Sequence, residues 1–131
     1  MNYKTYEVKE FKNGDIEYLK DGKLHRENDK PACETTSGYK AWYKHGVRHR
    51  DNGPAIIFAS GTIEYRKDGK LHREDGPAIE WSDGTKSYYL NGILYTKENY
   101  YKKLNGKTYN IKGKQVSEDT IHEALKHYIN K

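Results

Sequence analysis

One eight-residue phrase recurs along this chain and constrains its fold more than any other feature. It reads KDGKLHRE at Lys20–Glu27 and again at Lys67–Glu74, and a degenerate copy, KHGVRHRD, stands at Lys44–Asp51. Recurrence at a fixed period is typical of repeat architectures, in which one small structural module stacks on copies of itself. The chain is therefore expected to contain successive copies of one module.

Glycines fix the period of this module. The first glycine of each copy is followed by a second glycine eight residues later, and we number the copies as repeats 1 to 4. The first glycines are Gly14, Gly38, Gly61 and Gly84, spaced by 24, 23 and 23 residues, and the second are Gly22, Gly46, Gly69 and Gly92. The series His25, His49 and His72 keeps the same phase, and Tyr95 replaces the histidine in repeat 4. Repeat 4 is thus a degraded copy.

The residues around these glycines predict reversals of the chain. Asn, Asp or Ser precedes every one of them except Gly46, which follows His45. Asn-Gly and Asp-Gly favour two-residue hairpin turns, because both central residues there adopt positive φ. Runs between the turns, such as TIEYRK and AIEW, alternate in hydrophobicity as strands do. Each repeat predicts a strand of about six residues, a tight turn, and a longer return leg that Gly-Pro interrupts with a kink or bulge.

The whole pattern predicts a mainly β fold: an antiparallel meander of β-hairpin repeats. Aromatic residues align four positions after each first glycine, and we expect this aromatic face to hold the array together; they are Tyr18, Trp42, Tyr65 and Tyr88. On the return leg Cys33, Ile56 and Ile79 align, and Thr35, Phe58 and Trp81 follow two residues later. Alternation along a strand places these two return-leg sets on one common face.

Two regions are expected. Residues 1–95 hold the repeat array, with repeats starting near Asn13, Ser37, Ser60 and Asp83. In residues 96–131, KENYYKKL before Asn105-Gly106 predicts a short helix, Lys112-Gly113 the turn of a small hairpin, and Ser117 the start of a second, amphipathic helix. We expect this helix-hairpin-helix region to cap the exposed end of the sheet. Binding of a partner by its last helix is the alternative.

Composition narrows the classes of partner. The net charge is +5, but residues 1–96 carry 16 basic and 15 acidic side chains, so the surplus lies in residues 97–131 with 8 and 4. The lone Cys33 allows no internal disulfide and suits a reducing compartment. No apolar run resembles a signal peptide or a membrane span. A cytoplasmic location without membrane association is expected.

The phrase G-x-x-x-[YW]-x-x-x-G-x-x-H-R-x-[DN]-G-P-A resembles the MORN-like repeats of phage, large-virus and bacterial proteins. It appears as GYKAWYKHGVRHRDNGPA from Gly38 and as GTIEYRKDGKLHREDGPA from Gly61. Repeat 1 has Lys30 in place of the glycine of GPA, and repeat 4 lacks both His-Arg and GPA. The resemblance implies a hairpin per repeat and a binding scaffold with no catalytic residues. It also implies an accessory protein that inhibits or adapts a host protein, in the host cytoplasm if a phage encodes it.

The histidine series is the first candidate site. Equivalent side chains of successive hairpins lie about 10 Å apart, whereas zinc holds nitrogen ligands at about 2.0–2.1 Å. The series therefore predicts no shared metal and no cofactor, and each imidazole is expected to bond to the EDGPA loop that follows it. A metal-dependent hydrolase that uses these histidines is kept as an alternative.

The arginines after the histidines are the second candidate. Arg26, Arg50 and Arg73 form a ladder that suits phosphates, with tyrosines available to stack on bases. Each has an acidic neighbour, Glu27, Asp51 or Glu74, and an arginine bound to that carboxylate is not available to phosphate. Nucleic-acid or nucleotide binding, also through the basic C-terminal tail, is the first alternative function.

No nucleophile stands at motif spacing from a base, so no catalytic residue and no enzyme activity is predicted. The positions at which the repeats differ indicate a contact surface instead. Five and ten residues after the first glycine, Tyr43, Arg48 and Tyr89 depart from the other copies, and Tyr and Arg anchor protein interfaces. We predict a non-enzymatic protein-binding module that uses Tyr43, Arg48 and Tyr89, with partner and oligomeric state left open.

Overall fold

A computed structural model describes residues 5–105, 108–111 and 114–117, with side chains described for residues 5–105. The chain divides into two compact parts, residues 1–94 and residues 95–131, and each is described by itself.

The described residues contain sixteen strands and one helix. They are β1 (Tyr6–Glu10), β2 (Ile16–Lys20), β3 (Lys23–Leu24), β4 (Cys33–Glu34), β5 (Lys40–Ala41), β6 (Tyr43–Lys44), β7 (Val47–Arg48), β8 (Ile56–Ile57), β9 (Ile63–Glu64), β10 (Arg66–Lys67), β11 (Lys70–Leu71), β12 (Ile79–Glu80), β13 (Lys86–Leu90), β14 (Ile93–Tyr95), α1 (Lys97–Asn105), β15 (Thr108–Ile111) and β16 (Lys114–Ser117).

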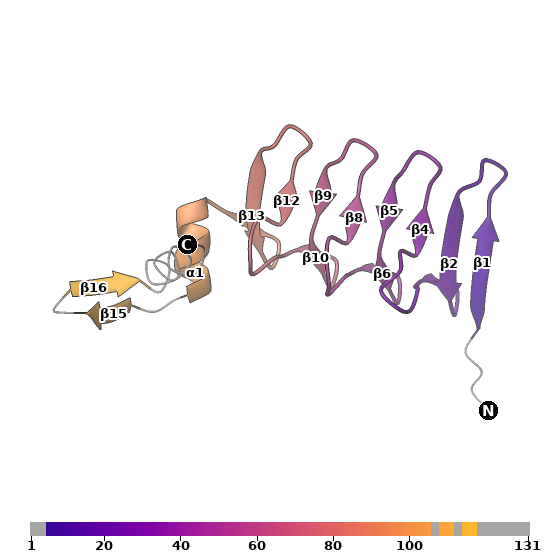
Figure 1. Cartoon of the computed structure of the whole chain (residues 1–131). Coiled ribbons are helices and arrows are strands. Elements are labelled where there is room, and N and C mark those ends of the chain that lie inside the picture. Colours follow the sequence, from indigo (N-terminus) through magenta and orange to yellow (C-terminus); the bar gives the residue numbers. More distant parts are fainter. Residues whose placement is uncertain (1–4, 106–107, 112–113, 118–131) are drawn as a thin grey trace, which may run out of the picture. The chain divides into compact units, whose positions relative to one another are not determined.

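The first part is built around one ten-stranded antiparallel sheet in which the strands follow one another in chain order (Figure 1). The order is β1-β2-β4-β5-β8-β9-β12-β13-β14, with β3 paired to β2. Two-stranded ladders, β6–β7 and β10–β11, occupy in repeats 2 and 3 the place that β2–β3 takes in repeat 1. The predicted mainly β, antiparallel hairpin meander is confirmed.

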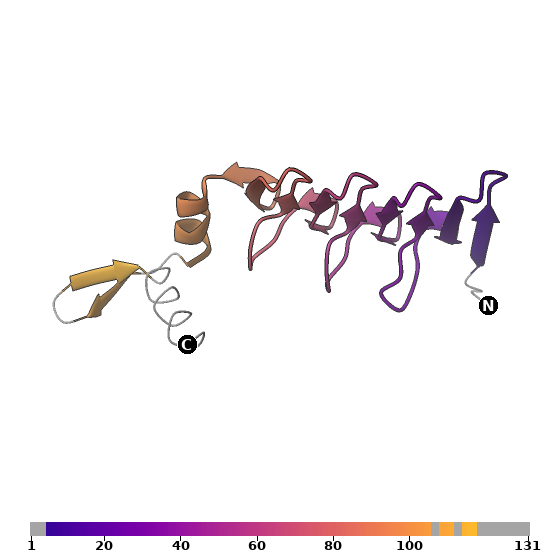
Figure 2. The ribbon, with the colours of Figure 1, turned by 45° about the horizontal axis from the view of Figure 1, so that its top comes forward.

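Each repeat uses its long strand twice. In repeat 1 the beginning of β2 pairs with β4 (Ile16↔Glu34), and its end pairs with β3 (Leu19↔Leu24). The return leg is therefore not a strand with a kink or bulge: a full loop, residues 25–32, separates β3 from β4. Equivalent loops, residues 49–55 and 72–78, follow in repeats 2 and 3, and the three hang side by side from the sheet in Figure 2. The proline stands one residue before the ladder resumes at Ala32, where its missing N–H costs no ladder bond.

The two glycine series form different turns. Before the second glycines, Asp21, His45, Asp68 and Asn91 all have φ near +50°, so these are the predicted two-residue turns with positive φ at both positions. In the turns that contain the first glycines, only the glycine has positive φ, and the residue before it does not. There a three-residue loop closes from Phe11 to Asp15 (N to O, 2.9 Å), a type I turn with a bulge at Gly14. The prediction of primed turns was wrong for this series, because Asn13 accepts the N–H of Asp15 through its side chain instead (3.0 Å).

Strand register separates the side chains onto two faces. Residues directly opposite one another in an antiparallel ladder share a face. Cys33 lies opposite Glu17 on one side and Ala41 on the other. Ile56 in turn lies opposite Ala41 and Glu64, so all five residues lie on one face. We call the face with this row face A. It continues toward the first-glycine turns with the pairs Thr35 and Tyr39, Phe58 and Thr62, and Trp81 and Thr85. The predicted common face for the two return-leg sets agrees with this register.

The opposite side, face B, carries the aromatic column. One residue further along the same ladders, aromatic residues alternate with alanines, and the N–H of the aromatic residue donates to the alanine carbonyl; the row is Tyr18, Ala32, Trp42, Ala55, Tyr65, Ala78 and Tyr88. All three alanines are fully buried, and Trp42 and Tyr88 are buried as well. A fully buried position in the row leaves no room for a larger side chain, which explains the alanine of the GPA phrase.

The second part begins with α1, as the sequence predicts. Thr96 caps the helix by accepting the N–H of Asn99 (3.1 Å), and Glu98 pairs with Lys102 one turn later (3.0 Å). Tyr100 is fully buried. The predicted hairpin is present as β15 paired with β16. The predicted second helix after Ser117, with its capping or partner-binding role, lies outside the described residues.

Candidate functional site

The three histidines join each repeat to the next. Their Nε2 atoms lie 3.0, 2.9 and 3.3 Å from the carboxylates of Glu27, Asp51 and Glu74, which belong to the following loop as predicted. Their Nδ1 atoms accept a backbone N–H from the tight turn of the next repeat, a contact that the sequence did not indicate. The donors are His45 (3.0 Å), Asp68 (3.0 Å) and Asn91 (2.9 Å). In this pattern the neutral ring carries its proton on Nε2.

The glycine after each of these residues reinforces the joint. The N–H of Gly46 donates to the carbonyl of Leu24, and the equivalent bonds run from Gly69 to Arg48 and from Gly92 to Leu71, each at 2.8 Å. The histidine acts on the following repeat, and Tyr95 takes its place in repeat 4, after which the repeat pattern does not continue in residues 96–131.

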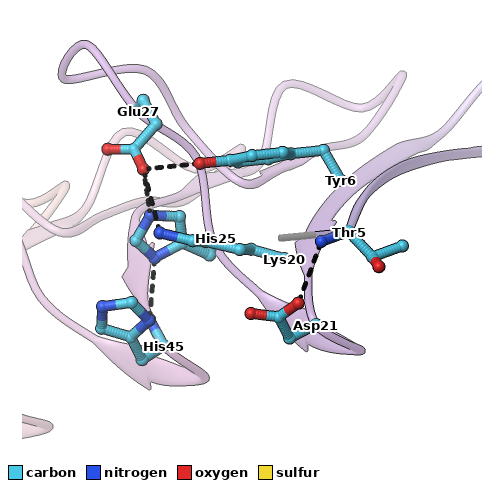
Figure 3. Close-up of polar contacts among 7 residues, drawn as sticks. All are labelled: Thr5, Tyr6, Lys20, Asp21, His25, Glu27 and His45. Carbon is cyan, nitrogen blue, oxygen red and sulfur yellow. Dashed lines mark hydrogen bonds and ion pairs between the residues drawn. The ribbon is translucent and has the colours of Figure 1, made fainter. Parts of the chain in front are cut away.

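The first of these joints is also tied to β1 (Figure 3). Glu27 accepts hydrogen bonds from the imidazole of His25, the hydroxyl of Tyr6 (3.3 Å) and the ammonium of Lys20 (3.4 Å). The hydrogen bond from His25 and that from Lys20 hold the pKa of Glu27 below its usual value, against partial desolvation. Thr5 also donates its N–H to the carboxylate of Asp21 (3.0 Å).

The imidazole of His45 stacks on that of His25, a member of the series. Its ring lies 4.5 Å from that of His25, centroid to centroid, with the two planes at 28°. Desolvation, followed by the charge of His25, lowers the pKa of His45 from its usual 6.5. Two stacked rings do not make a metal site: in the part of the chain that the structure describes, no group of three or more His, Cys, Asp or Glu side chains is arranged to hold a metal ion.

The three arginines lie over the aromatic column of face B. Their guanidinium carbons sit 3.6, 3.9 and 3.9 Å from the ring centroids of Tyr18, Trp42 and Tyr65. Each Nη1 donates to the carbonyl of the loop proline at 3.1 Å; the acceptors are Pro31, Pro54 and Pro77. The arginines thus fasten their loops onto the sheet.

Their acidic partners differ from the predicted ones. The neighbouring carboxylates bind the histidines, so Arg26 pairs with Glu34 (3.6 Å) and Arg73 with Asp75 (2.9 Å). Arg50 reaches back to Asp29 of the preceding loop with two bonds, at 2.9 and 3.3 Å. The prediction that each arginine binds the carboxylate next to it was wrong, but all three are engaged. Arg50 and Arg73 line a hollow between the second and third loops while they are paired with Asp29 and Asp75.

Two of the predicted contact residues touch one another. Nε of Arg48 donates to the hydroxyl of Tyr43 at 3.1 Å, and the guanidinium lies 5.8 Å from the centroid of that ring. They are opposite residues of the β6–β7 ladder. Tyr43 is half-buried and Arg48 is exposed. Arg48 also interacts with the side chain of Tyr39.

Tyr39 and Phe58 extend this contact along face A. Their rings meet edge to face at 5.7 Å within repeat 2, where Tyr39 precedes β5 and Phe58 follows its partner strand β8. Burial raises the pKa of Tyr39, and the neighbouring Tyr43 adds to that rise while Arg48 opposes it. We call Tyr39, Tyr43, Arg48 and Phe58 the aromatic cluster. Tyr39 was not predicted, although position one after the first glycine reads Asp15, Tyr39, Thr62 and Thr85, and this divergence was the available signal.

The remaining residues of face A lie further along the sheet. Trp81 follows Phe58 in its row, is 44% exposed, and donates its indole N–H to Ser87 at 3.0 Å. Tyr89 stands in the column of Tyr43 two repeats away and is half-buried, next to the last residue of β13. Tyr89 therefore shares a face with Tyr43 and Arg48 but belongs to a separate stretch of it.

Cys33 packs in face A beside Glu17 and Asp15, and burial followed by these acidic neighbours raises the pKa of its thiol. A raised pKa disfavours the reactive thiolate.

Among the described residues, no helix is both long and apolar enough to cross a bilayer. Comparison of the chain with protein-family models, curated proteins and solved structures returned no match.

Proposed function

We propose that this chain is a non-enzymatic protein-binding module and that the aromatic cluster on face A is the centre of its contact surface. The observation that carries the proposal is the Tyr43–Arg48 bond beside the Tyr39–Phe58 contact. Tyrosine and arginine dominate the residues that anchor protein interfaces, because they combine large apolar area with directed polar bonds.

The chemistry of the cluster describes the partner. Arg48 bonds Tyr43 through Nε and also interacts with the side chain of Tyr39, and as an exposed cation it can add a carboxylate of the partner to these contacts. Tyr39 and Phe58 offer ring edges and faces to apolar side chains. The proposed partner is a folded protein that presents an apolar patch next to an Asp or Glu. The resemblance to MORN-like repeats supports a host protein that this module inhibits or adapts.

A photo-crosslinking amino acid at position 43 tests the proposal in living cells. It should join the chain to one predominant protein, whereas the same group at Asn52, on the exposed loop of repeat 2, should not. Binding of the purified partner should then be lost in Tyr43→Ala with Arg48→Ala, while the thermal unfolding midpoint changes little. Lys44→Ala, an exposed neighbour, is the matched control.

Two outcomes would refute the proposal. Equal crosslinking from positions 43 and 52 would remove the special status of face A. Crosslinking to nucleic acid, with an affinity that falls steeply as salt rises, would favour the nucleic-acid alternative.

A further inference from the structure

Strand β1 leaves one edge of the sheet open. It pairs with β2 along its full length, from Tyr6↔Lys20 to Glu10↔Ile16, and in the described part of the chain no strand pairs with its other side. All five of its residues are exposed, with Tyr6 at 56% and Val8 at 59%. Such an edge presents a row of backbone donors and acceptors to whatever strand can match it.

The hydrogen bonds at the two ends of β1 show which residues face outward. Asp21 donates its N–H to the carbonyl of Thr5 (2.7 Å), and Phe11 donates its N–H to the carbonyl of Asp15 (2.9 Å). Backbone groups alternate in direction along a strand, so the odd-numbered residues point to β2. The N–H and C=O groups of Tyr6, Val8 and Glu10 therefore point away from the sheet.

These three residues match themselves in the antiparallel direction. If two copies meet about a two-fold axis at Val8, then Val8 pairs with Val8 of the other copy and Tyr6 pairs with Glu10. Each of these is a pair in which two residues exchange two backbone bonds. Every outward donor and acceptor of the strand is then used.

The charged residues of β1 match in the same register. Glu7 stands opposite Lys9 of the other copy, and Lys9 opposite Glu7, in the closely spaced pairs that bring side chains nearest. An axis at Glu10 would instead place two glutamates opposite one another. Charges on an edge strand normally oppose pairing, but here each meets its opposite.

We propose that β1 binds β1 of a second copy of this chain, antiparallel about Val8, so that two sheets join into one. The contact is isologous, and therefore closes at two copies. Two five-residue strands form an interface at the small end of the known range, so the dimer is expected to be weak and concentration-dependent. It would present two copies of face A, which raises avidity for a multivalent partner, although the proposal stands independently of the partner.

Sedimentation velocity over a concentration series tests this proposal through a charge exchange. Lys9→Glu alone and Glu7→Lys alone each place like charges opposite one another and should weaken self-association about tenfold or more. An equimolar mixture of the two variants restores both Glu–Lys pairs and should associate again. The double variant Glu7→Lys with Lys9→Glu should behave as the original chain.

Val8→Pro supplies a second test that leaves the fold of the sheet in place. The N–H that proline removes points away from β2, so the β1–β2 ladder and the thermal midpoint should be retained while the dimer is lost. Lys9→Pro, which removes an N–H directed at β2, is the matched control and should lower the thermal midpoint. A chain that stays monomeric at every soluble concentration would overturn the proposal. So would a dimer that persists in Val8→Pro or that ignores the charge exchange.

Discussion

The imidazole of His49 accepts the backbone N–H of Asp68 at 3.0 Å, and its other nitrogen lies 2.9 Å from Asp51. One ring thereby holds its own loop and the tight turn of the following repeat at once. Its side chain is 10% exposed, while the carboxylate of Asp51 is 64% exposed.

Replacement of His49 should separate its bonding role from its packing role. His49→Leu keeps apolar volume but removes the acceptor of the Asp68 N–H, and should lower the free energy of unfolding by about 0.5–1.5 kcal/mol. His49→Asn keeps an acceptor near the position of Nδ1 and should lose less. Urea denaturation measures both. Equal losses in the two variants would mean that the bond contributes nothing.

Gly22 and Gly69 occupy equivalent turns, with φ of +79° and +83°, but have different surroundings. Alanine at either position carries the left-handed backbone penalty of about 1–2 kcal/mol. At Gly69 the added Cβ also meets Cγ1 of Val47 at 3.1 Å, whereas nothing lies within 4 Å at Gly22.

Gly69→Ala should therefore lower the thermal midpoint more than Gly22→Ala does. In the background of Val47→Ala this difference should shrink. A larger loss at Gly22 would contradict the contact-based explanation.

The stacked ring of His45 should make the chain sensitive to acid. Its pKa is lowered by desolvation and by His25, so the unfolded chain takes up a proton at a higher pH than the folded chain does. Stability is therefore expected to fall as pH drops below the usual histidine value of 6.5, and to be independent of this group at neutral pH and above.

His45→Asn keeps a residue that tolerates positive φ and should flatten this part of the pH profile. The ring resonances of His45 in an NMR titration give the shift directly. A ring that titrates at or above its usual value would contradict the prediction.

Arg50→Lys should be costly although it keeps the charge. Lysine cannot stack as a plane on Trp42 or bind Asp29 with two nitrogens, so the unfolding free energy should fall by about 1–2 kcal/mol. In a Trp81→Phe background the fluorescence of Trp42 should change as well, because the cation over its ring is displaced. Unchanged stability and emission would mean that the arginine contributes little to holding the loop.

The sequence predicts the parts of this fold that depend on neighbouring residues. Glycine spacing located every reversal, and alternation located the strands, because turns and pleats are determined within a few residues. The extent of the loop at residues 25–32 was missed, since a proline reveals that a ladder stops but not how far the chain departs from it.

Contacts between repeats were harder to predict. Arg50 binds Asp29, which lies 21 residues earlier, within a first loop that is one residue longer than the others. No local pattern links these two positions. Among the candidate residues, repeat divergence identified Tyr43 and Arg48, which touch, but only coordinates reveal that Tyr89 stands apart from them.

The acceptor side of each inter-repeat joint is a histidine, but the donor side is main chain, and its side chain is His45, Asp68 or Asn91 without change in the bond. The histidine can therefore bind any following repeat that forms the same tight turn, whatever side chain that turn carries. Such a chain can gain or lose whole repeats by duplication or deletion of a gene segment. The copies can then diverge in sequence and function while the hydrogen bonds between repeats are retained.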